Sequence, residues 1–259
     1  MRVVQYRVLT RILNKLEVPD YIFAFEKDKS IPKMAELHVR KEVVMSFDIK
    51  DFFPSIKQFL VQEMFIGVGI GAAPARTLSE ICTYKSFVPQ GALTSPKISN
   101  LIAASSFGPI IKQYCDSKGL TLSIYADDIT ISSMEEVNFE EIKTFVSETL
   151  STFNMKLNKA KSKYMRKCIR QYVCGVVVNQ KTNLLRRERY KLRAIVHNIA
   201  KNGVDIEAAK NGMEGGEFLS HVRGKLNWFN QLNPAIAGKL TLKIQNVLAQ
   251  NSFETVITT

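Results

Sequence analysis

The 259-residue sequence contains only four cysteines, and their spacing excludes a zinc site of the C-x-x-C type. Cys82, Cys115, Cys168 and Cys174 are scattered along the chain, and we expect them to be reduced. The longest weakly polar stretch, residues 65–75, is too short and too rich in glycine to span a bilayer. Arginines interrupt the apolar residues at the start of the sequence, which argues against a secretory signal. We therefore expect a cytoplasmic protein that does not enter a membrane.

Acidic residues are scarce relative to basic ones. The chain has 36 Lys and Arg against 24 Asp and Glu, a formal net charge of +12. Between Lys156 and Lys201 there are 14 basic residues and a single acid, Glu188. A surplus of this kind favours a polyanionic partner, nucleic acid first and an acidic membrane surface second. A stretch with almost only positive charges indicates a surface that contacts the phosphates along a nucleic-acid backbone; a solvated helix face is the alternative.

The pattern of apolar residues predicts an α+β fold: a mixed sheet region followed by an all-helical end. Caps, prolines and helical spacing predict several helices, and alternation of strand formers predicts the strands. The expected strands are 43–49, 124–132, 171–179 and 184–187. The expected helices are 4–16, 75–84, 94–114 and 138–153. From Glu188 onward we expect only helices, with breaks near Gly203, at 215–216 and before Pro234.

The segment IYADDITIS, residues 124–132, places two aspartates side by side within an apolar run. Isoleucine, tyrosine and threonine favour strands, so two short strands should meet in a tight turn at Ala126, Asp127 and Asp128. An ordinary hairpin would explain the aspartates, because Asp tolerates turn geometry. Acidic residues elsewhere in the chain must decide between a turn and a functional site.

Asp48, near the end of the apolar strand VVMSFDI, is such a residue. If this strand lies beside the hairpin in an antiparallel sheet, Asp48 and Asp127 share one edge, with Asp128 next to them. Crowded carboxylates repel each other unless a divalent cation neutralises them. Their oxygens suit Mg²⁺, whose coordination shell is usually completed by substrate phosphates. The sequence thus predicts either phosphodiester hydrolysis or nucleotidyl transfer with a pair of metals.

Five segments, in order, resemble the palm motifs of reverse transcriptases: FDIKDFFPS, VPQGALTSPKISNLI, YADD, LNKAKS and VCGVVV. Within that family the chain is most similar to bacterial retron reverse transcriptases. MAELH at 34–38 resembles their N-A-x-x-H motif, with Met34 in the place of asparagine. VCG at 173–175 resembles V-T-G, with Cys174 for threonine, and HVRGKLNWF at 221–229 resembles the start of a thumb helix. Group II intron relatives and other bacterial defence reverse transcriptases are the alternatives.

The resemblance implies a right-hand polymerase fold: a palm with an antiparallel sheet and helices on one face, an all-helical thumb, and only part of the fingers. The expected divisions are 1–40 for the remnant of the fingers and a connecting helix, 41–180 for the palm and 181–259 for the thumb. The family's fingers hairpin, which clamps the triphosphate, is missing. We therefore expect a truncated chain, a clamp supplied by another subunit, or weak nucleotide binding.

The resemblance also assigns the catalytic residues. It implies metal binding by Asp48 and Asp127, with Asp128 completing the triad and the Ile49 carbonyl as a further ligand. Two Mg²⁺ ions, with Mn²⁺ able to substitute, would activate the primer hydroxyl and hold the triphosphate for in-line attack. Lys161 is a candidate acid near the leaving pyrophosphate; a surface lysine is the alternative.

Other residues are implied to bind nucleotide or nucleic acid. Phe53 is expected to exclude a ribose 2′-hydroxyl, while its neighbour Phe52 fits a core position better. Gln90 and Gly91 are expected at the incoming nucleotide. The residues expected to contact primer, template or duplex are Tyr125, Val173, Cys174, Gly175, His38, Arg186, Arg187, Arg189, Lys191 and Arg193.

The resemblance implies RNA-directed DNA synthesis, in which a structured RNA is copied into DNA from deoxynucleoside triphosphates. The resemblance to retrons further implies an effector protein as partner and a role in phage defence. A weakly active or inactive RNA-binding scaffold on the same fold is the main alternative, favoured by the missing fingers. A metal nuclease is a third, which explains the carboxylates but neither Phe53 nor the PQG segment.

Overall fold

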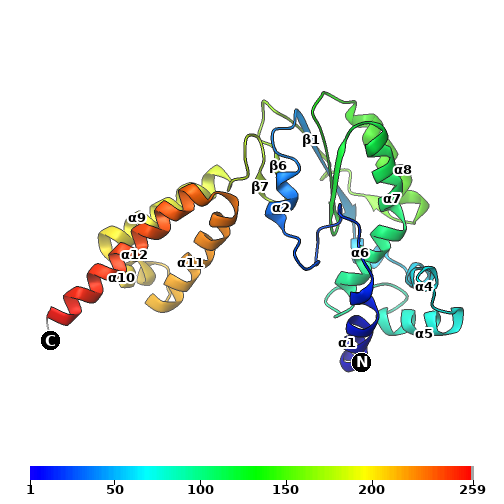
Figure 1. Cartoon of the computed structure of the whole chain (residues 1–259), viewed down its shortest axis with the longest axis horizontal. Helices are drawn as coiled ribbons and strands as arrows, with labels where there is room; N and C mark the ends of the chain where they lie inside the picture. Colours follow the sequence, from blue (N-terminus) through cyan, green and yellow to red (C-terminus); the bar gives the residue numbers. More distant parts are fainter. Residues whose placement is uncertain (258–259) are drawn as a thin grey trace. The chain divides into compact units, whose positions relative to one another are not determined.

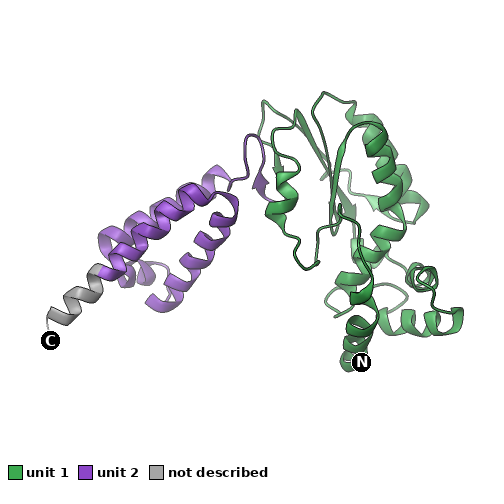
Figure 2. Cartoon of the chain, viewed as in Figure 1, with its two compact units in different colours: residues 1–174 green, residues 175–259 purple. Residues whose placement is uncertain are grey.

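The computed structural model describes residues 1–257, with side chains described through residue 249. The chain divides into two compact units, residues 1–174 and 175–259 (Figure 2). The division falls in the turn between two short strands, β6 (Tyr172–Val173) and β7 (Val176–Val177). The predicted three-part division into fingers remnant, palm and thumb stays a prediction.

The first unit is built around an antiparallel sheet (Figure 1). Its strands are β1 (Val43–Lys50), β2 (Thr121–Tyr125), β3 (Asp128–Ser133), β4 (Lys156–Leu157) and β5 (Lys163–Arg166). They lie in the order β2-β3-β1-β4, and β5 also pairs with β1. Because β1 pairs with three other strands, it is the central strand, and its apolar residues are buried accordingly.

One face of the sheet packs against long helices. The side chains of Met45, Phe47 and Ile49 alternate along β1 and are almost completely buried, as the period of a strand requires. Helix α7 (Phe107–Ser117) packs against β2 and helix α8 (Phe139–Thr152) packs against β4, while α6 (Ser95–Ser105) packs against α7. The side chain of Asn138 accepts hydrogen bonds from the first free N–H groups of α8, so the predicted helix cap is confirmed.

Further helices complete the first unit: α1 (Arg2–Arg11), the 3₁₀ turn η1 (Leu13–Lys15), α2 (Ile31–Glu36), α3 (Phe52–Ser55), α4 (Gln58–Gly67) and α5 (Ala72–Cys82). The first helix was predicted to reach residue 16, but it ends at Arg11 and continues only as η1. Among residues 1–257, none of the helices combines the length and the apolar character needed to cross a bilayer.

The helix predicted from residue 94 to about 114 is two helices. The backbone breaks at Ser106, with φ −124° and ψ −103°, between α6 and α7. Gly108 then approaches the carbonyl oxygen of Ala103 so closely that a Cβ atom would clash with it. The apolar spacing predicted the buried faces of both helices but could not reveal this break, which depends on close packing between backbones.

The second unit contains helices only beyond β7: α9 (Arg186–Asn202), α10 (Val204–Lys210), α11 (Gly215–Leu232) and α12 (Pro234–Ile257). Its separate core consists of apolar side chains at helical spacing, among them Leu192, Val196, Phe218, Val222 and Phe229. The predicted all-helical end of the chain therefore has its own hydrophobic core.

Two local predictions in the second unit are wrong. The predicted strand 184–187 does not form, because Arg186 and Arg187 already begin α9 and only Asn183 pairs with Val177. The helix predicted to break at residues 215–216 instead begins there. The predicted break at Gly203 is confirmed, with φ +87°, a conformation that favours glycine.

Candidate active site

Two of the predicted acidic residues lie opposite each other on neighbouring strands. Asp48 in β1 is the cross-strand partner of Asp128 in β3. Side chains of directly opposed residues in an antiparallel pair lie on the same face of the sheet, with Cβ atoms about 4.5–5.5 Å apart. The prediction that strand 43–49 lies beside the hairpin is therefore confirmed, and it holds two carboxylates together.

The third acid lies in the turn that joins β2 to β3. Ala126 adopts a left-handed conformation, with φ +53°, and the carbonyl of Asp127 accepts a hydrogen bond of 2.9 Å from the N–H of Ile49. This bond fixes the turn to the end of β1. Asp127 is exposed, whereas Asp48 and Asp128 are partly buried. All three aspartates are thus at one edge of the sheet, and Asp127 is the most accessible.

Asp48 is held by two side chains from the segment after β4. Lys161 Nζ lies 2.8 Å from one carboxylate oxygen, and Asn158 Nδ2 donates to the other at 3.1 Å. The backbone N–H of Asn158 also donates to the Asp48 carbonyl at 2.7 Å. The hydrogen bond and charge of Asp48 raise the pKa of Lys161. Lys161 is therefore a cation at neutral pH.

Asp128 has a different environment. Its carboxylate accepts hydrogen bonds from Ser46 at 3.3 Å and from the thiol of Cys174 at 3.7 Å. Burial raises the pKa of Asp128, and the charges of Asp127 and Asp48 raise it further. Burial and the charge of Asp128 raise the pKa of Cys174 to about 12. The thiol therefore keeps its proton at neutral pH and donates a hydrogen bond to the Asp128 carboxylate.

The donor set fits a divalent cation only in part. Carboxylate oxygens are the ligands that Mg²⁺ prefers. However, within residues 1–257 no group of three or more His, Cys, Asp or Glu side chains is gathered closely enough to hold a metal ion. Asp48 and Asp127 line the same groove, while Asp128 is occupied by Ser46 and Cys174. The arrangement fits a cation bound by two aspartates and completed by oxygens from outside the protein.

A groove of about 550 Å³ passes these carboxylates. Predicted site residues from five separate segments meet there: β1, α3, the end of β2 with the β2–β3 turn, the loop after β4 and the loop before α6. Its lining includes Asp48, Ile49, Asp127, Lys161, Phe53, Gln90 and Tyr125. The sequence prediction that these residues converge is thereby supported, although their individual roles stay predictions.

Two adjacent aromatic residues face different surroundings, as predicted. Phe52 is 5% exposed and belongs to the core, whereas Phe53 is half-buried and only packs against it; both rings line the groove, Phe53 with the larger exposed part. Asp51 before them has φ +49°, which turns the chain away from β1. Gly91, with φ +90°, has open space where a side chain would be, so its backbone is accessible.

The predicted contact of His38 with a template or RNA is wrong. His38 is fully buried, and its two ring nitrogens lie 2.7 Å from the hydroxyl oxygens of Ser123 and Ser132. Burial lowers the pKa of His38 to about 3, and the charge of Lys41 adds to this effect. The histidine therefore joins α2 to the polar face of the sheet and cannot reach a ligand.

The VCG segment is only partly available to a primer. Val173 is 2% exposed, so its side chain is buried. Cys174 has a left-handed backbone, φ +44°, and its thiol contacts Asp128. Gly175, with φ +82°, begins the second unit. A contact with primer through this turn would have to use its backbone.

The five predicted basic residues form the first turns of α9. Arg186, Arg187, Lys191 and Arg193 are exposed, and Arg189 is partly so. Arg186 and Arg189 lie over the ring of Tyr190, at 5.4 and 6.0 Å. These cations stand on the second unit, and their role in binding a duplex stays a prediction.

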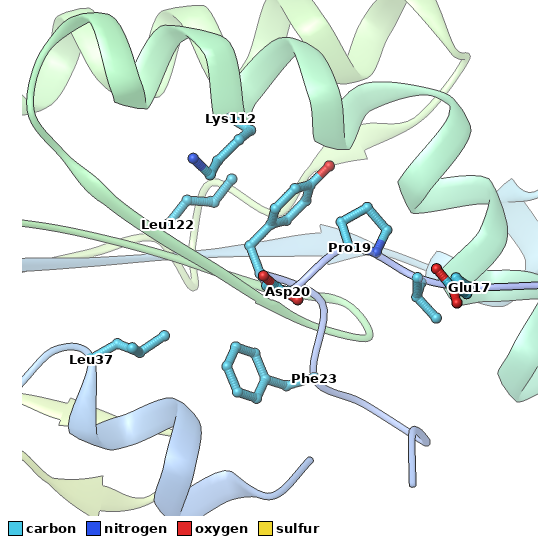
Figure 3. A pocket seen from close by; sticks show the side chains of 9 residues that line it. Glu17, Pro19, Asp20, Phe23, Leu37, Lys112 and Leu122 are labelled. Atoms are coloured by element: carbon cyan, nitrogen blue, oxygen red, sulfur yellow. The ribbon is translucent and has the colours of Figure 1, made fainter. Parts of the chain in front are cut away.

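A second cavity in the first unit, of about 780 Å³, is lined by the loop after η1 together with Leu37, Lys112 and Leu122 (Figure 3). The charge of Lys112 is already compensated by an ion pair with Asp116.

Three residues of the site were missed in the sequence. Asn158 and Ser46 bond the aspartates, and Phe25 lines the groove. Asn158 precedes Lys161 by one turn in the LNKAKS segment, which is a signal that could have indicated it. Ser46 lies two residues before Asp48 and so on the same face of the strand. No local pattern distinguishes Phe25 from a core phenylalanine.

The chain has similar solved and curated proteins. A telomerase from Candida albicans, solved with a fragment of telomeric RNA, aligns with a TM-score of 0.51 at 10% identity, over 95% of this chain and 51% of that one. At this identity the likeness shows the fold alone, and it confirms the α+β class. The retron Ec86 reverse transcriptase of Escherichia coli is 32% identical over 200 residues, 77% of this chain and 62% of the relative.

The retron Mx65 reverse transcriptase of Myxococcus xanthus is 29% identical over 261 residues, 93% of this chain and 58% of the relative. The chain thus spans about three fifths of the length of these curated relatives. Residues 1–184 match the family model for reverse transcriptase, described as RNA-dependent DNA polymerase. That match includes every residue of the groove, and with it the chain belongs to the reverse transcriptase family.

Proposed function

We propose that this chain is the catalytic region of an RNA-directed DNA polymerase of the retron type, which copies a structured RNA into DNA by two-metal nucleotidyl transfer. One observation carries the proposal: Asp48 and Asp127, from segments far apart in sequence, line a single groove together with Phe53 and Gln90. A nucleotidyl transferase needs acidic ligands and a nucleotide-sized space at the same place.

Asp48 and Asp127, with the Ile49 carbonyl, are the groups that would hold Mg²⁺. When bound, such ions lower the pKa of the primer hydroxyl and neutralise the triphosphate. Lys161 is protonated and already lies at the mouth of the groove, so it can donate a proton to the leaving pyrophosphate. Asp128 would add negative charge behind the two ligands, since Ser46 and Cys174 hold its carboxylate in place.

The proposal extends to substrate and partners. Phe53 would exclude a ribose 2′-hydroxyl, and Gln90 and Gly91 would contact the incoming deoxynucleotide. The exposed arginines and lysines of α9 would follow the phosphates of the RNA–DNA duplex. By analogy with retrons, we include an effector protein, a role in phage defence and a cytoplasmic location in the proposal; four unpaired cysteines are consistent with that location.

The ion pair between Lys161 and Asp48 favours one alternative, an inactive RNA-binding scaffold. In such a protein the lysine would permanently take the place of a metal ion, and the basic surface would bind RNA without chemistry. The alternative needs no change in the fold, so only activity can separate the two.

The test uses the purified chain with Mg²⁺, a primed RNA template and deoxynucleotides. We expect extension by the parent, and we expect Asp127→Asn to lower its rate on the order of a thousandfold, because several kcal/mol of metal-assisted stabilisation is lost. Asp116→Asn, an exposed acid of α7, is the matched control and should keep full activity. RNA binding without extension by the parent would instead support the scaffold.

A further inference from the structure

Phe25 is an exposed aromatic residue with an unfavourable backbone conformation. Its side chain is 51% exposed, and its φ is +59°. A bulky residue at positive φ is an outlier that costs free energy, and glycine would relieve it. Strain of this kind persists only where the surroundings impose it, and it concentrates at functional sites.

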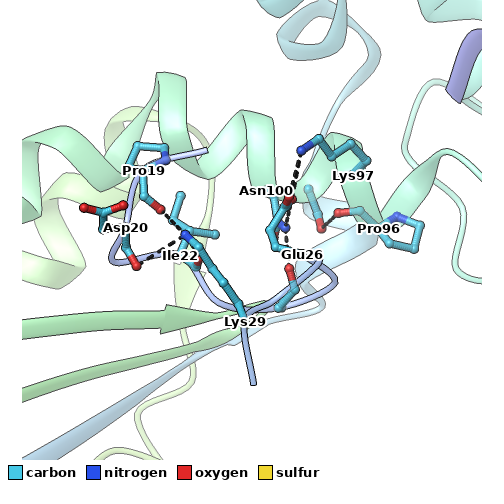
Figure 4. Close-up of polar contacts among 10 residues, drawn as sticks. Pro19, Asp20, Ile22, Glu26, Lys29, Pro96, Lys97 and Asn100 are labelled. Atoms are coloured by element: carbon cyan, nitrogen blue, oxygen red, sulfur yellow. Dashed lines mark hydrogen bonds and ion pairs between the residues drawn. The ribbon is translucent and has the colours of Figure 1, made fainter. Parts of the chain in front are cut away.

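The loop carrying Phe25 is anchored on one side by a nearly buried ion pair (Figure 4). Lys97 of α6 lies 2.9 Å from Glu26, and these side chains are 10% and 15% exposed. Asn100, one helical turn further, donates to Glu26 at 2.8 Å and to the carbonyl of Ala24. The residues on both sides of Phe25 are therefore fixed by α6.

The same loop is also fixed to the sheet. The N–H of Phe23 donates to Ile124 at 2.8 Å, and Ile124 donates back to Tyr21 at 2.7 Å. Lys29 Nζ donates to the carbonyl oxygens of Pro19 and Ile22, at 2.7 and 2.8 Å (Figure 4). Held at both ends, the loop fixes the backbone position of Phe25 before any ligand binds.

That position is the wall of the groove. Phe25 lines it together with Tyr125, whose ring centroid lies 6.3 Å away at an interplanar angle of 40°. Tyr125 ends β2, immediately before the Ala126–Asp127 turn. We infer that Phe25 is a base-stacking residue, which receives the face of one nucleobase of the primer or template bound against Asp48 and Asp127. The inference rests on the proposed function and adds a contact to it.

Aromatic rings bind bases without regard to sequence, and truncation of one such ring typically weakens binding on the order of tenfold. Prior fixation of the loop backbone adds affinity because less conformational freedom is lost on binding. Since the charge of Glu26 is compensated by Lys97, the neighbouring carboxylate does not repel the nucleic acid.

The test measures binding rather than synthesis. The full chain is titrated with a primed RNA template that carries the fluorescent base 2-aminopurine at successive template or primer positions. We expect Phe25→Ala to weaken binding on the order of tenfold and to abolish the fluorescence change at one position. Phe25→Tyr should keep both, and the position affected identifies the strand. Phe59→Ala, which removes an equally exposed ring (50%) from α4, is the control and should leave both unchanged.

Phe25→Gly separates binding from folding. Glycine accepts the positive φ, so this variant should unfold at the same or a higher temperature than the parent while binding as weakly as Phe25→Ala. Equal binding and fluorescence in parent and Phe25→Ala would overturn the inference alone. A parent that binds no primed template would overturn the proposed function, and the inference with it.

Discussion

Lys161 Nζ lies 2.8 Å from a carboxylate oxygen of Asp48, the residue at the centre of the predicted metal site. The lysine is 62% exposed and the aspartate 13% exposed, so the cation can move into solvent while the carboxylate stays in place. Lys161 therefore compensates the charge of Asp48 and would compete with a divalent ion for it. It also brings a proton donor to the groove.

Replacement of Lys161 should separate these effects. In Lys161→Met we expect half-saturation at a lower Mg²⁺ concentration, on the order of fivefold, because a competing charge is removed. The maximal extension rate should fall, because a proton donor is lost. Extension rates measured over a series of Mg²⁺ concentrations give both quantities. Unchanged half-saturation would show that Lys161 does not compete for Asp48.

His38 predicts a pH-dependent stability. Burial, followed by the charge of Lys41, lowers its pKa from the ordinary 6.5 of histidine to about 3. Below pH 6.5 the folded state therefore binds fewer protons than the unfolded state. The contribution of neutral His38 to the free energy of unfolding is complete above pH 6.5 and is lost as the pH falls toward 3. His38→Gln can keep both serine contacts without titrating. Between pH 7 and pH 4, urea unfolding should show the parent losing about 3 kcal/mol more than this variant; parallel losses would contradict the prediction.

Phe53 and Phe52 predict opposite outcomes of the same truncation. Phe53→Ala should lower the preference for deoxynucleotides over ribonucleotides on the order of tenfold or more, because a half-exposed part of the groove wall is removed. Phe52→Ala should mainly cost unfolding free energy, about 3–5 kcal/mol, because its side chain is 5% exposed. Single-nucleotide extension and urea unfolding measure the two. A Phe53→Ala variant that still rejects ribonucleotides would exclude the gate.

The Lys97–Glu26 pair should be important for stability. Loss of one partner leaves a nearly buried charge uncompensated, so Lys97→Met is expected to cost about 3–5 kcal/mol. Arg76 and Glu80 on α5 form a matched exposed pair, 73% and 52% exposed. Arg76→Met should cost less than about 1 kcal/mol in the same urea titration. Equal costs would mean that burial of the Lys97 pair contributes little.

The convergence of the site could be predicted because its parts have strong local patterns. An acid ending a strand and two acids in a hairpin turn require only the correct antiparallel pairing to meet. Phe52 is more buried than Phe53, as expected, but the alternation of an extended chain is not the reason, because both residues lie on α3. The LNKAKS resemblance placed Lys161 near the acids, where the structure has it.

The remaining features depend on contacts between distant segments. Nothing near His38 in the sequence reveals the two serines that bury it, and nothing near Phe25 reveals the anchors on α6. The break at Ser106 follows from close backbone packing at Gly108, which helical spacing does not encode. The prediction of a strand at 184–187 was wrong for a simpler reason, since arginines are good helix formers and Arg186 and Arg187 begin α9.

The most direct test of the account counts metal ions. Binding of Mn²⁺, followed by electron paramagnetic resonance, is measured with a primed RNA template ending in a dideoxynucleotide and with the next deoxynucleoside triphosphate. We predict a pair of bound ions in the parent and in Asp116→Asn, and at least one fewer in Asp48→Asn and in Asp127→Asn. The same number of ions, bound with the same affinity, in all four proteins would contradict the account.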